Sequence, residues 1–179
     1  MGRRESVREA WREEIVAHRA ALDEFVAAAH ALSPERWGAE RSPGHWSPAQ
    51  VAEHLRLTYV TVRAELAHRG GFRVRARWWQ RRWLRLFVVP RILRTGRFPS
   101  GAPATREIRP GAGPFARPAL LRDLAEEGAS FLAEVAALDP VGFGGLTHPF
   151  FGKLAPLAGL RLLRFHLTHH RAQSADPEP

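Results

Sequence analysis

Apolar residues recur at steps of three and four along most of this chain, with charged residues between them. That spacing gathers apolar side chains on one face of a helix. It predicts four long amphipathic helices, over residues 4–32, 47–66, 119–138 and 157–173. A short tail follows the last helix, at 174–179. We find no convincing two-residue alternation of a strand and no internal repeat. The pattern therefore predicts an all-α fold, a four-helix bundle in a single domain spanning residues 1–179.

Capping and helix-breaking residues mark the ends of these helices. The clearest boundary is the start of the second helix, where Ser47 offers an N-cap and Pro48 occupies the first helical position, which needs no N–H. Gln50 can complete a capping box with Ser47. Residues 98–118 and 142–156 contain several glycines and prolines and are predicted to be long loops.

The last predicted helix carries two histidines, His166 and His170, on one face. An ideal helix turns about 100° per residue, so residues four apart lie within about 40° of each other. The same arc holds Leu160, Leu163 and Leu167. Both imidazoles should therefore point into the bundle, whereas His169 lies on the flank. Two imidazoles one turn apart can bind one cation if a third ligand comes from a facing element.

Two further histidines lie on the first two predicted helices. His18 lies on the apolar stripe of the first helix, where a lone histidine is typical of a hydrogen-bonded core residue. His54 lies at the edge of the stripe of the second helix, in line with Gln50 and Thr58. By spacing alone, His54 is expected to be a half-exposed residue on a boundary face.

The composition excludes several kinds of chemistry. The chain has no cysteine, which excludes a disulfide framework, a thiolate nucleophile and cysteine-ligated zinc. A metal site would therefore use nitrogen and oxygen ligands. The first ten residues are polar and charged, and no apolar run approaches the roughly 18 residues of a membrane span. We expect a soluble, cytoplasmic protein.

Residues 72–97 differ from the rest of the chain because they hold nine arginines and no acidic residue, a charge of +9 that equals the net charge of the protein. Trp79 and Trp83 follow helical spacing, which predicts an extra basic amphipathic helix that stops or kinks near Pro90. With the loop after it, this helix forms an insertion over 72–117. Three interpretations are open: a helix docked on the core with solvated arginines, a helix on an anionic membrane surface, and a nucleic-acid contact. The tryptophans are also compatible with a homodimer interface.

Three segments of the sequence together resemble the DinB-like (YfiT-like) superfamily of four-helix bundles. They are W-S-P-A-Q-V-A-E-H-L at 46–55, H-P-F-F-G at 148–152 and H-L-T-H-H-R-A-Q at 166–173. In that family, one histidine of the second helix and two of the fourth, four residues apart, bind a divalent metal. The resemblance therefore implies a metal site formed by His54, His166 and His170.

The resemblance also implies a metal-dependent enzyme that acts on a small molecule. Three imidazoles leave coordination positions open on zinc, nickel, manganese or iron, and such a metal activates water or a thiolate. Family members include thiol-dependent S-transferases and isomerases that use low-molecular-weight thiols, and proteins proposed to be metal-dependent hydrolases. A low-molecular-weight thiol as co-substrate suits a chain without cysteine. The catalytic residues and the reaction itself are not specified by the resemblance.

The sequence allows a second kind of function. The bundle can be non-catalytic, with the arginine- and tryptophan-rich helix binding an anionic membrane, a nucleic acid or a protein partner.

Polar residues near the three histidines are candidates to orient them or to line the pocket. A metal-bound histidine usually donates its other N–H to a carboxylate, carbonyl or amide. Gln50 lies one turn before His54, and Gln173 lies three residues after His170. Thr58, one turn after His54, is a candidate pocket residue.

Other polar residues of these segments are expected to have different roles. Glu53 and His169 each lie about 100° around their helix from the adjacent histidine of the site, so we expect neither to be a ligand. His148 is expected to have a structural role, such as holding the turn at Pro149, in preference to a role at the mouth of the active site.

Overall fold

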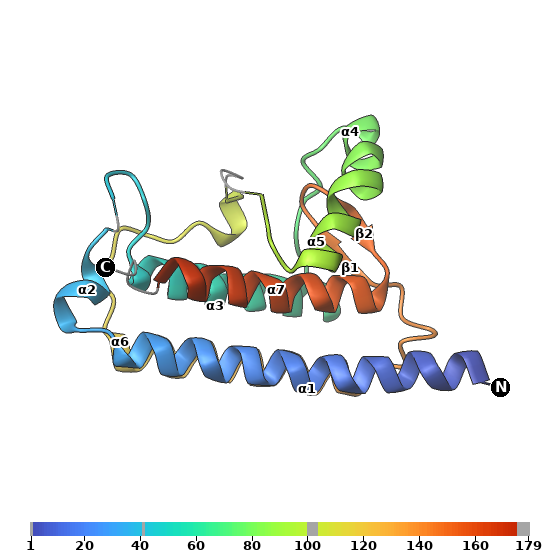
Figure 1. Ribbon diagram of the computed structural model, residues 1–179, viewed down its shortest axis with the longest axis horizontal. Helices are drawn as coiled ribbons and strands as arrows, with labels where there is room; N and C mark the ends of the chain where they lie inside the picture. The colour runs from blue at the N-terminus through green and yellow to red at the C-terminus, as the bar shows by residue number, and fades with distance from the viewer. Residues whose placement is uncertain (1, 41, 100–103, 175–179) are drawn as a thin grey trace.

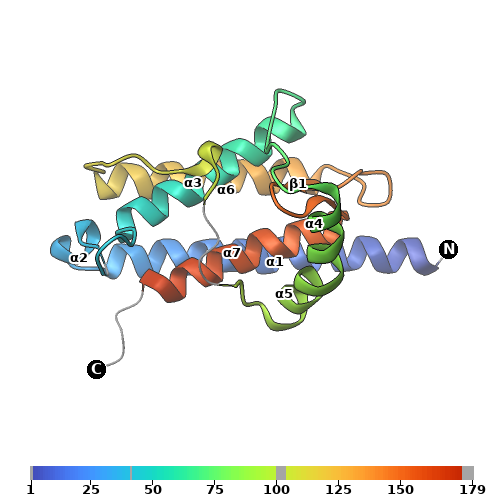
Figure 2. The ribbon, with the colours of Figure 1, turned by 90° about the horizontal axis from the view of Figure 1, so that it is seen from above.

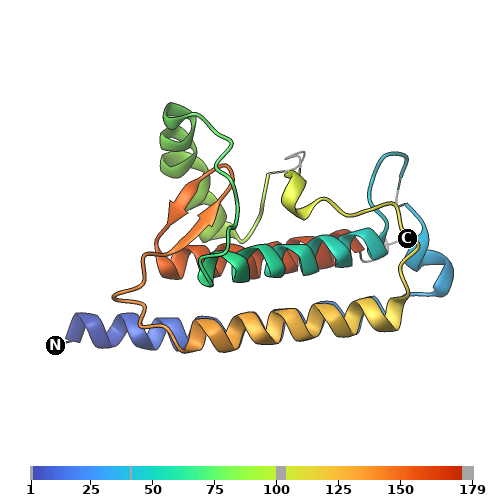
Figure 3. The same cartoon turned by 180° about the vertical axis from the view of Figure 1, so that it is seen from behind.

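The computed structural model describes residues 2–40, 42–99 and 104–174. In this part of the chain, the body of the molecule consists of the long helices α1 (Gly2–Ala31), α3 (Pro48–Leu66), α6 (Arg117–Ala136) and α7 (Pro156–Ser174). They lie in two layers, with α1 beside α6 and α3 beside α7 (Figures 1 and 3). The fold is the all-α bundle that the apolar pattern predicted. Beyond Ser174, the predicted tail lies outside the described residues.

An apolar core fills the space between the two layers. Its largest buried side chains include Phe25 of α1, Leu55 of α3, Phe131 of α6 and Leu167 of α7. These side chains meet because each helix turns its apolar stripe inward. None of the described helices combines the length and the apolar character that a membrane span requires.

Two short elements lie where the sequence pattern predicted only connections. The helix α2 (Pro34–Gly38) follows α1, and an antiparallel hairpin of β1 (Leu146–His148) and β2 (Gly152–Leu154) precedes α7. The expectation of no strand was therefore wrong within 142–156. Strands of three residues are too short for an alternating pattern to be visible.

The turn of this hairpin is held by His148. Its Nδ1 atom accepts hydrogen bonds from the backbone N–H groups of Phe150, at 3.2 Å, and Phe151, at 3.3 Å. The ring also stacks on Phe151, with 4.1 Å between ring centroids. These contacts agree with a structural role for His148.

The basic segment forms one continuous helical stretch from α4 (Trp78–Trp83) through the π-helical turn η1 (Leu84–Val88) to α5 (Val89–Thr95). The helix does not stop at Pro90, which lies in the first turn of α5, directly after the π-helical turn. The irregularity that proline was expected to cause is the π-helical turn just before it.

The side of this segment that packs on the bundle is not the side that carries Trp79 and Trp83. Val89 and Ile92 are buried against Phe151 and Leu154 of the hairpin and Leu162 of α7. The interpretation as a docked helix would place Trp79 and Trp83 on the packed face, yet they lie on the outer side, more than half exposed. Local spacing showed that the segment is a helix but did not show which side meets the core.

Candidate metal centre

The start of α3 fixes the position of His54. Ser47 and Gln50 form the predicted capping box: the Ser47 hydroxyl accepts a hydrogen bond from the Gln50 N–H, and the Gln50 side chain accepts one from the Ser47 N–H. His54 follows one turn later and points towards α7. Its side chain is only 3% exposed, so the expectation from spacing alone, a half-exposed boundary residue, was wrong.

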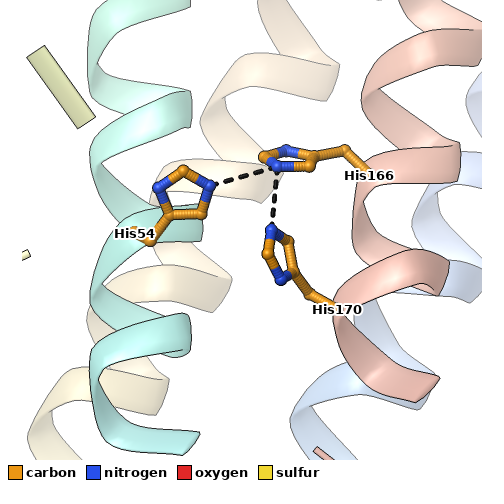
Figure 4. A group of neighbouring side chains, drawn as sticks. All are labelled: His54, His166 and His170. Carbon is orange, nitrogen blue, oxygen red and sulfur yellow. Dashed lines mark hydrogen bonds between the residues drawn. The ribbon is translucent and has the colours of Figure 1, made fainter. Parts of the chain in front are cut away.

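The imidazoles of His54, His166 and His170 converge between α3 and α7 (Figure 4). The Nε2 atom of His166 lies 3.1 Å from Nε2 of His54 and 3.0 Å from Nε2 of His170. For comparison, nitrogen ligands held about 2.0–2.1 Å from a tetrahedral zinc ion lie roughly 3.3 Å apart. Both separations are therefore close to those of ligands on a shared metal ion, and all three ligand atoms lie within 4.8 Å of one another.

Hydrogen bonds on the far side of two rings turn their Nε2 atoms towards the centre of the cluster. The Nδ1–H of His54 donates to the carbonyl oxygen of Ile108 at 2.7 Å. The Nδ1–H of His170 donates to Oε1 of Gln173 at 2.8 Å. In a neutral imidazole, a protonated Nδ1 makes Nε2 a hydrogen-bond acceptor, so both rings present an acceptor to His166.

Two Nε2 atoms, those of His54 and His170, are thus acceptors for the same donor on His166. A proton on Nε2 of His166 can be donated to His54 or to His170, but not to both at full strength. A cation between the three nitrogen atoms would satisfy all of them at once. The chemistry of the donor set therefore fits a divalent metal.

The surroundings keep the three imidazoles neutral, which is the form that binds metal. Burial lowers the pKa of His54 to about 4. Burial, reinforced by the neighbouring histidines, lowers the pKa of His170 to about 3 and holds that of His166 well below its ordinary value. At neutral pH, the rings are therefore uncharged, and a metal does not have to compete with their ionisation.

Aromatic side chains flank the cluster. The ring of Trp46 lies 4.9 Å from that of His54, measured between centroids, and Phe98 lies 5.8 Å from His166. Within the described residues, no carboxylate joins the three imidazoles. A three-nitrogen set of this kind leaves coordination positions for water or a substrate, as in catalytic rather than structural sites.

Of the three polar residues predicted to lie near the site, only Gln173 forms a hydrogen bond, within the described part of the chain, to the ring of one of the three histidines. Gln173 contacts His170, as described above. Gln50 uses its side chain for the helix cap and for a hydrogen bond to the Gly111 carbonyl. Thr58 is buried, and its hydroxyl donates to the backbone carbonyl of His54 at 2.8 Å. Thr58 therefore hydrogen-bonds to the main chain of His54.

Residues that were expected to lie outside the ligand set do so. Glu53 pairs with Arg56, and Nε2 of His169 lies 2.9 Å from the amide nitrogen of Gln173. His18 is fully buried elsewhere in the core, hydrogen-bonded to the Tyr59 hydroxyl at 2.8 Å.

The Ile108 carbonyl is the contact that sequence reasoning missed. It lies at the end of a short 3-10 helix, η2 (Arg106–Ile108), inside the predicted loop 98–118. A main-chain oxygen has no signature in the sequence. The sequence offered one weak signal: Ile108 is a large apolar residue in a glycine- and proline-rich segment, which suggests that this part of the loop packs on the core. Ile108 is indeed buried.

A family model matches residues 17–174, nearly the whole described chain. The chain belongs to the DinB superfamily. This membership and the three adjacent histidines fit a metal-dependent enzyme. No match to the chain was found among curated proteins or among solved structures.

Proposed function

We propose that this DinB-superfamily protein is a divalent-metal-dependent enzyme that acts on a small molecule, with His54, His166 and His170 as the metal ligands. The observation that carries the proposal is the convergence of three Nε2 atoms from two helices, with Nε2 of His166 3.1 Å from that of His54 and 3.0 Å from that of His170. An all-imidazole donor set favours zinc, nickel or iron, whereas manganese prefers carboxylate oxygens.

The bound metal would supply Lewis acidity, lowering the pKa of a water or thiol at an open position. The chain's own residues prepare the site for it. The Ile108 carbonyl and the Gln173 amide fix the rings of His54 and His170, and such contacts raise the affinity of a histidine for metal. Trp46 and Phe98 place apolar rings against those of His54 and His166.

The reaction we favour is transfer to or from a low-molecular-weight thiol, with hydrolysis as the alternative. The chain has no cysteine, so a thiolate nucleophile has to come from a co-substrate. The resemblance to thiol-dependent transferases and to proposed hydrolases of the same superfamily supports both reaction types.

The first test is elemental analysis of untagged protein purified without added metal or chelator. We expect about one transition-metal ion per chain in the wild type, since one cluster of three ligands binds one ion. His54→Ala and His170→Ala should lose the metal while keeping their helical circular dichroism. His169→Ala is the matched control, because it removes the adjacent histidine outside the cluster and should retain the metal.

Full metal occupancy in both His54→Ala and His170→Ala would show that the ligands are wrongly assigned. The reaction is tested separately, by screening thiol transfer to electrophiles and the hydrolysis of esters and amides. Activity that is lost with a chelator, restored by the metal found, and unaffected by His169→Ala would support the proposal. Activity that survives the loss of all three histidines would contradict it.

A further inference from the structure

Large apolar side chains lie in solvent on the outer side of α4 and η1. Their exposed fractions are 70% for Trp78, 52% for Trp79, 56% for Trp83, 64% for Leu86 and 61% for Phe87. We call these five residues the outer aromatic face. Trp79, Trp83 and Phe87 follow at four-residue steps, and the rings of Trp83 and Phe87 lie 5.5 Å apart. These three residues therefore form a stripe along the helix, with Trp78 and Leu86 also exposed on it.

Packing of the segment on the bundle does not require this stripe. The opposite side already holds it in place, through Val89 and Ile92 and the half-buried Leu84 and Val88. Contiguous apolar side chains that are left in water are typical of an interaction site.

The segment that carries the outer aromatic face is rich in exposed arginines. Residues 72–97 hold nine of them and no acidic residue, and eight of the nine are exposed. Arg75 forms an ion pair with Glu107, and none of the other eight forms one within the described residues. By contrast, Arg63 and Arg164 of the bundle pair with glutamates. The segment therefore presents uncompensated positive charge beside its apolar stripe.

The placement of α4 leaves this surface open to a broad partner. Figures 1 and 3 show α4 standing clear of the two layers of long helices. Seen from above, α4 and α5 cross over the start of α7, beside the hairpin (Figure 2). A flat surface can approach the outer end of this segment without meeting α1 or α6.

We propose that the outer aromatic face and its arginines dock the protein on the surface of an anionic lipid bilayer. Tryptophan is favoured at the membrane interface because its ring is apolar and its N–H is polar. Leu86 and Phe87 would enter the boundary of the acyl chains. The arginines would extend to the anionic headgroups, with their aliphatic stems along the apolar stripe.

Other partners match the surface less well. Nucleic acid would neutralise the arginines and stack on tryptophan, but it offers little to the aliphatic side chain of Leu86. A second copy meeting this face symmetrically would bring two segments of charge +9 together. An anionic bilayer complements both the charge and the apolar stripe.

The test measures co-sedimentation of the full chain with lipid vesicles. Vesicles of phosphatidylcholine with about 30 mol % phosphatidylserine should bind the protein, and pure phosphatidylcholine should bind it at least about tenfold more weakly. Raising the salt from about 50 to about 300 mM should weaken binding to the anionic vesicles by about tenfold or more.

Two sets of variants separate the apolar and the charged contributions. Trp79→Ser, Trp83→Ser and Phe87→Ser together should reduce binding at least about tenfold, because interfacial binding scales with the apolar area buried. The matched control replaces three exposed apolar residues elsewhere with serine, at Val16, Val60 and Val141, and should bind as the wild type does.

For charge, Arg82→Ser with Arg85→Ser should weaken binding and flatten its salt dependence. The matched pair Arg3→Ser and Arg12→Ser, on α1, should change neither. All four sets replace exposed residues, so their helical circular dichroism should match the wild type.

Three outcomes would overturn the proposal. The first is no binding to anionic vesicles at low salt. The second is vesicle binding that the triple serine variant leaves unchanged. The third is a self-associated form, or a complex with double-stranded DNA, that is lost in the triple serine variant while vesicles do not bind. The variant lacking all three site histidines should still bind vesicles, so this test is independent of the proposed metal site.

Discussion

Gln173 determines how His170 presents its ring to the cluster. Its Oε1 atom accepts the Nδ1–H of His170, and its amide nitrogen contacts Nε2 of the neighbouring His169. One side chain therefore ties a residue of the cluster to a histidine outside it. Gln50, the other candidate amide, contacts the helix cap and the Gly111 carbonyl instead.

This difference predicts that two alanine substitutions affect different properties, Gln173→Ala the metal affinity and Gln50→Ala the free energy of unfolding. Gln173→Ala should weaken metal affinity about 10- to 100-fold, because His170 loses the acceptor that orients it. Gln173→Glu, which keeps an acceptor oxygen, should restore most of the affinity. Gln50→Ala should leave metal affinity unchanged and lower the free energy of unfolding by about 1 kcal/mol through the lost cap. Competition titration with a chelator and urea unfolding measure the two quantities.

At the scale of elements, the close packing of α1, α3 and α6 depends on a glycine. A Cβ atom on Gly128 of α6 would lie 2.4 Å from a terminal methyl of Leu22 and 3.2 Å from the ring of Tyr59. Leu22 and Tyr59 are both buried and cannot swing into solvent. The absence of a side chain at residue 128 therefore allows the layers to meet.

Gly128→Ala should destabilise the bundle, although alanine is the better helix former. The gain in helix propensity is at most about 1 kcal/mol, while overpacking a core costs typically about 1–3 kcal/mol. We expect a net loss of about 1–2 kcal/mol in urea unfolding. Gly38→Ala at the end of α2, where a Cβ atom meets nothing within 4 Å, is the control and should be nearly neutral. A stability of Gly128→Ala equal to that of the wild type would show that the helices separate freely.

At the scale of the whole molecule, buried neutral histidines make stability depend on pH. Burial lowers the pKa of His18 to about 3, whereas an unfolded histidine has a pKa of about 6.5. Below pH 6.5, the unfolded chain binds a proton that folded His18 does not bind. The free energy of unfolding therefore falls as the pH drops from about 6.5 towards 3, and is unaffected by this residue above that range.

The contribution of His18 can be isolated with its partner Tyr59. His18→Leu combined with Tyr59→Phe removes both polar groups, so neither is left buried without a partner. Between pH 7 and pH 5, the double variant should lose about 2 kcal/mol less stability than the wild type. Urea unfolding at several pH values, with chelator present throughout, measures this difference. An identical pH dependence in both proteins would show that His18 is protonated in the folded state.

The sequence by itself determined the features that depend on neighbours along the chain. Steps of three and four residues produced the long helices, and Ser47 with Gln50 marked the start of α3, since a cap is formed within four residues. The four-residue step from His166 to His170 placed both rings on one face, because helical geometry is local.

Only the tertiary structure decided what meets across the molecule. The spacing around His54 predicted a half-exposed residue on a boundary face. The family resemblance, not the spacing, assigned His54 to the metal site. The Nε2 atom of His54 comes within 3.1 Å of His166 because α3 packs beside α7 and a loop covers the cluster with the Ile108 carbonyl. Packing likewise decided that Trp79 and Trp83 lie in solvent while Val89 and Ile92 are buried. Periodicity defines the faces of a helix, but the surface that each face meets depends on residues far away in the sequence.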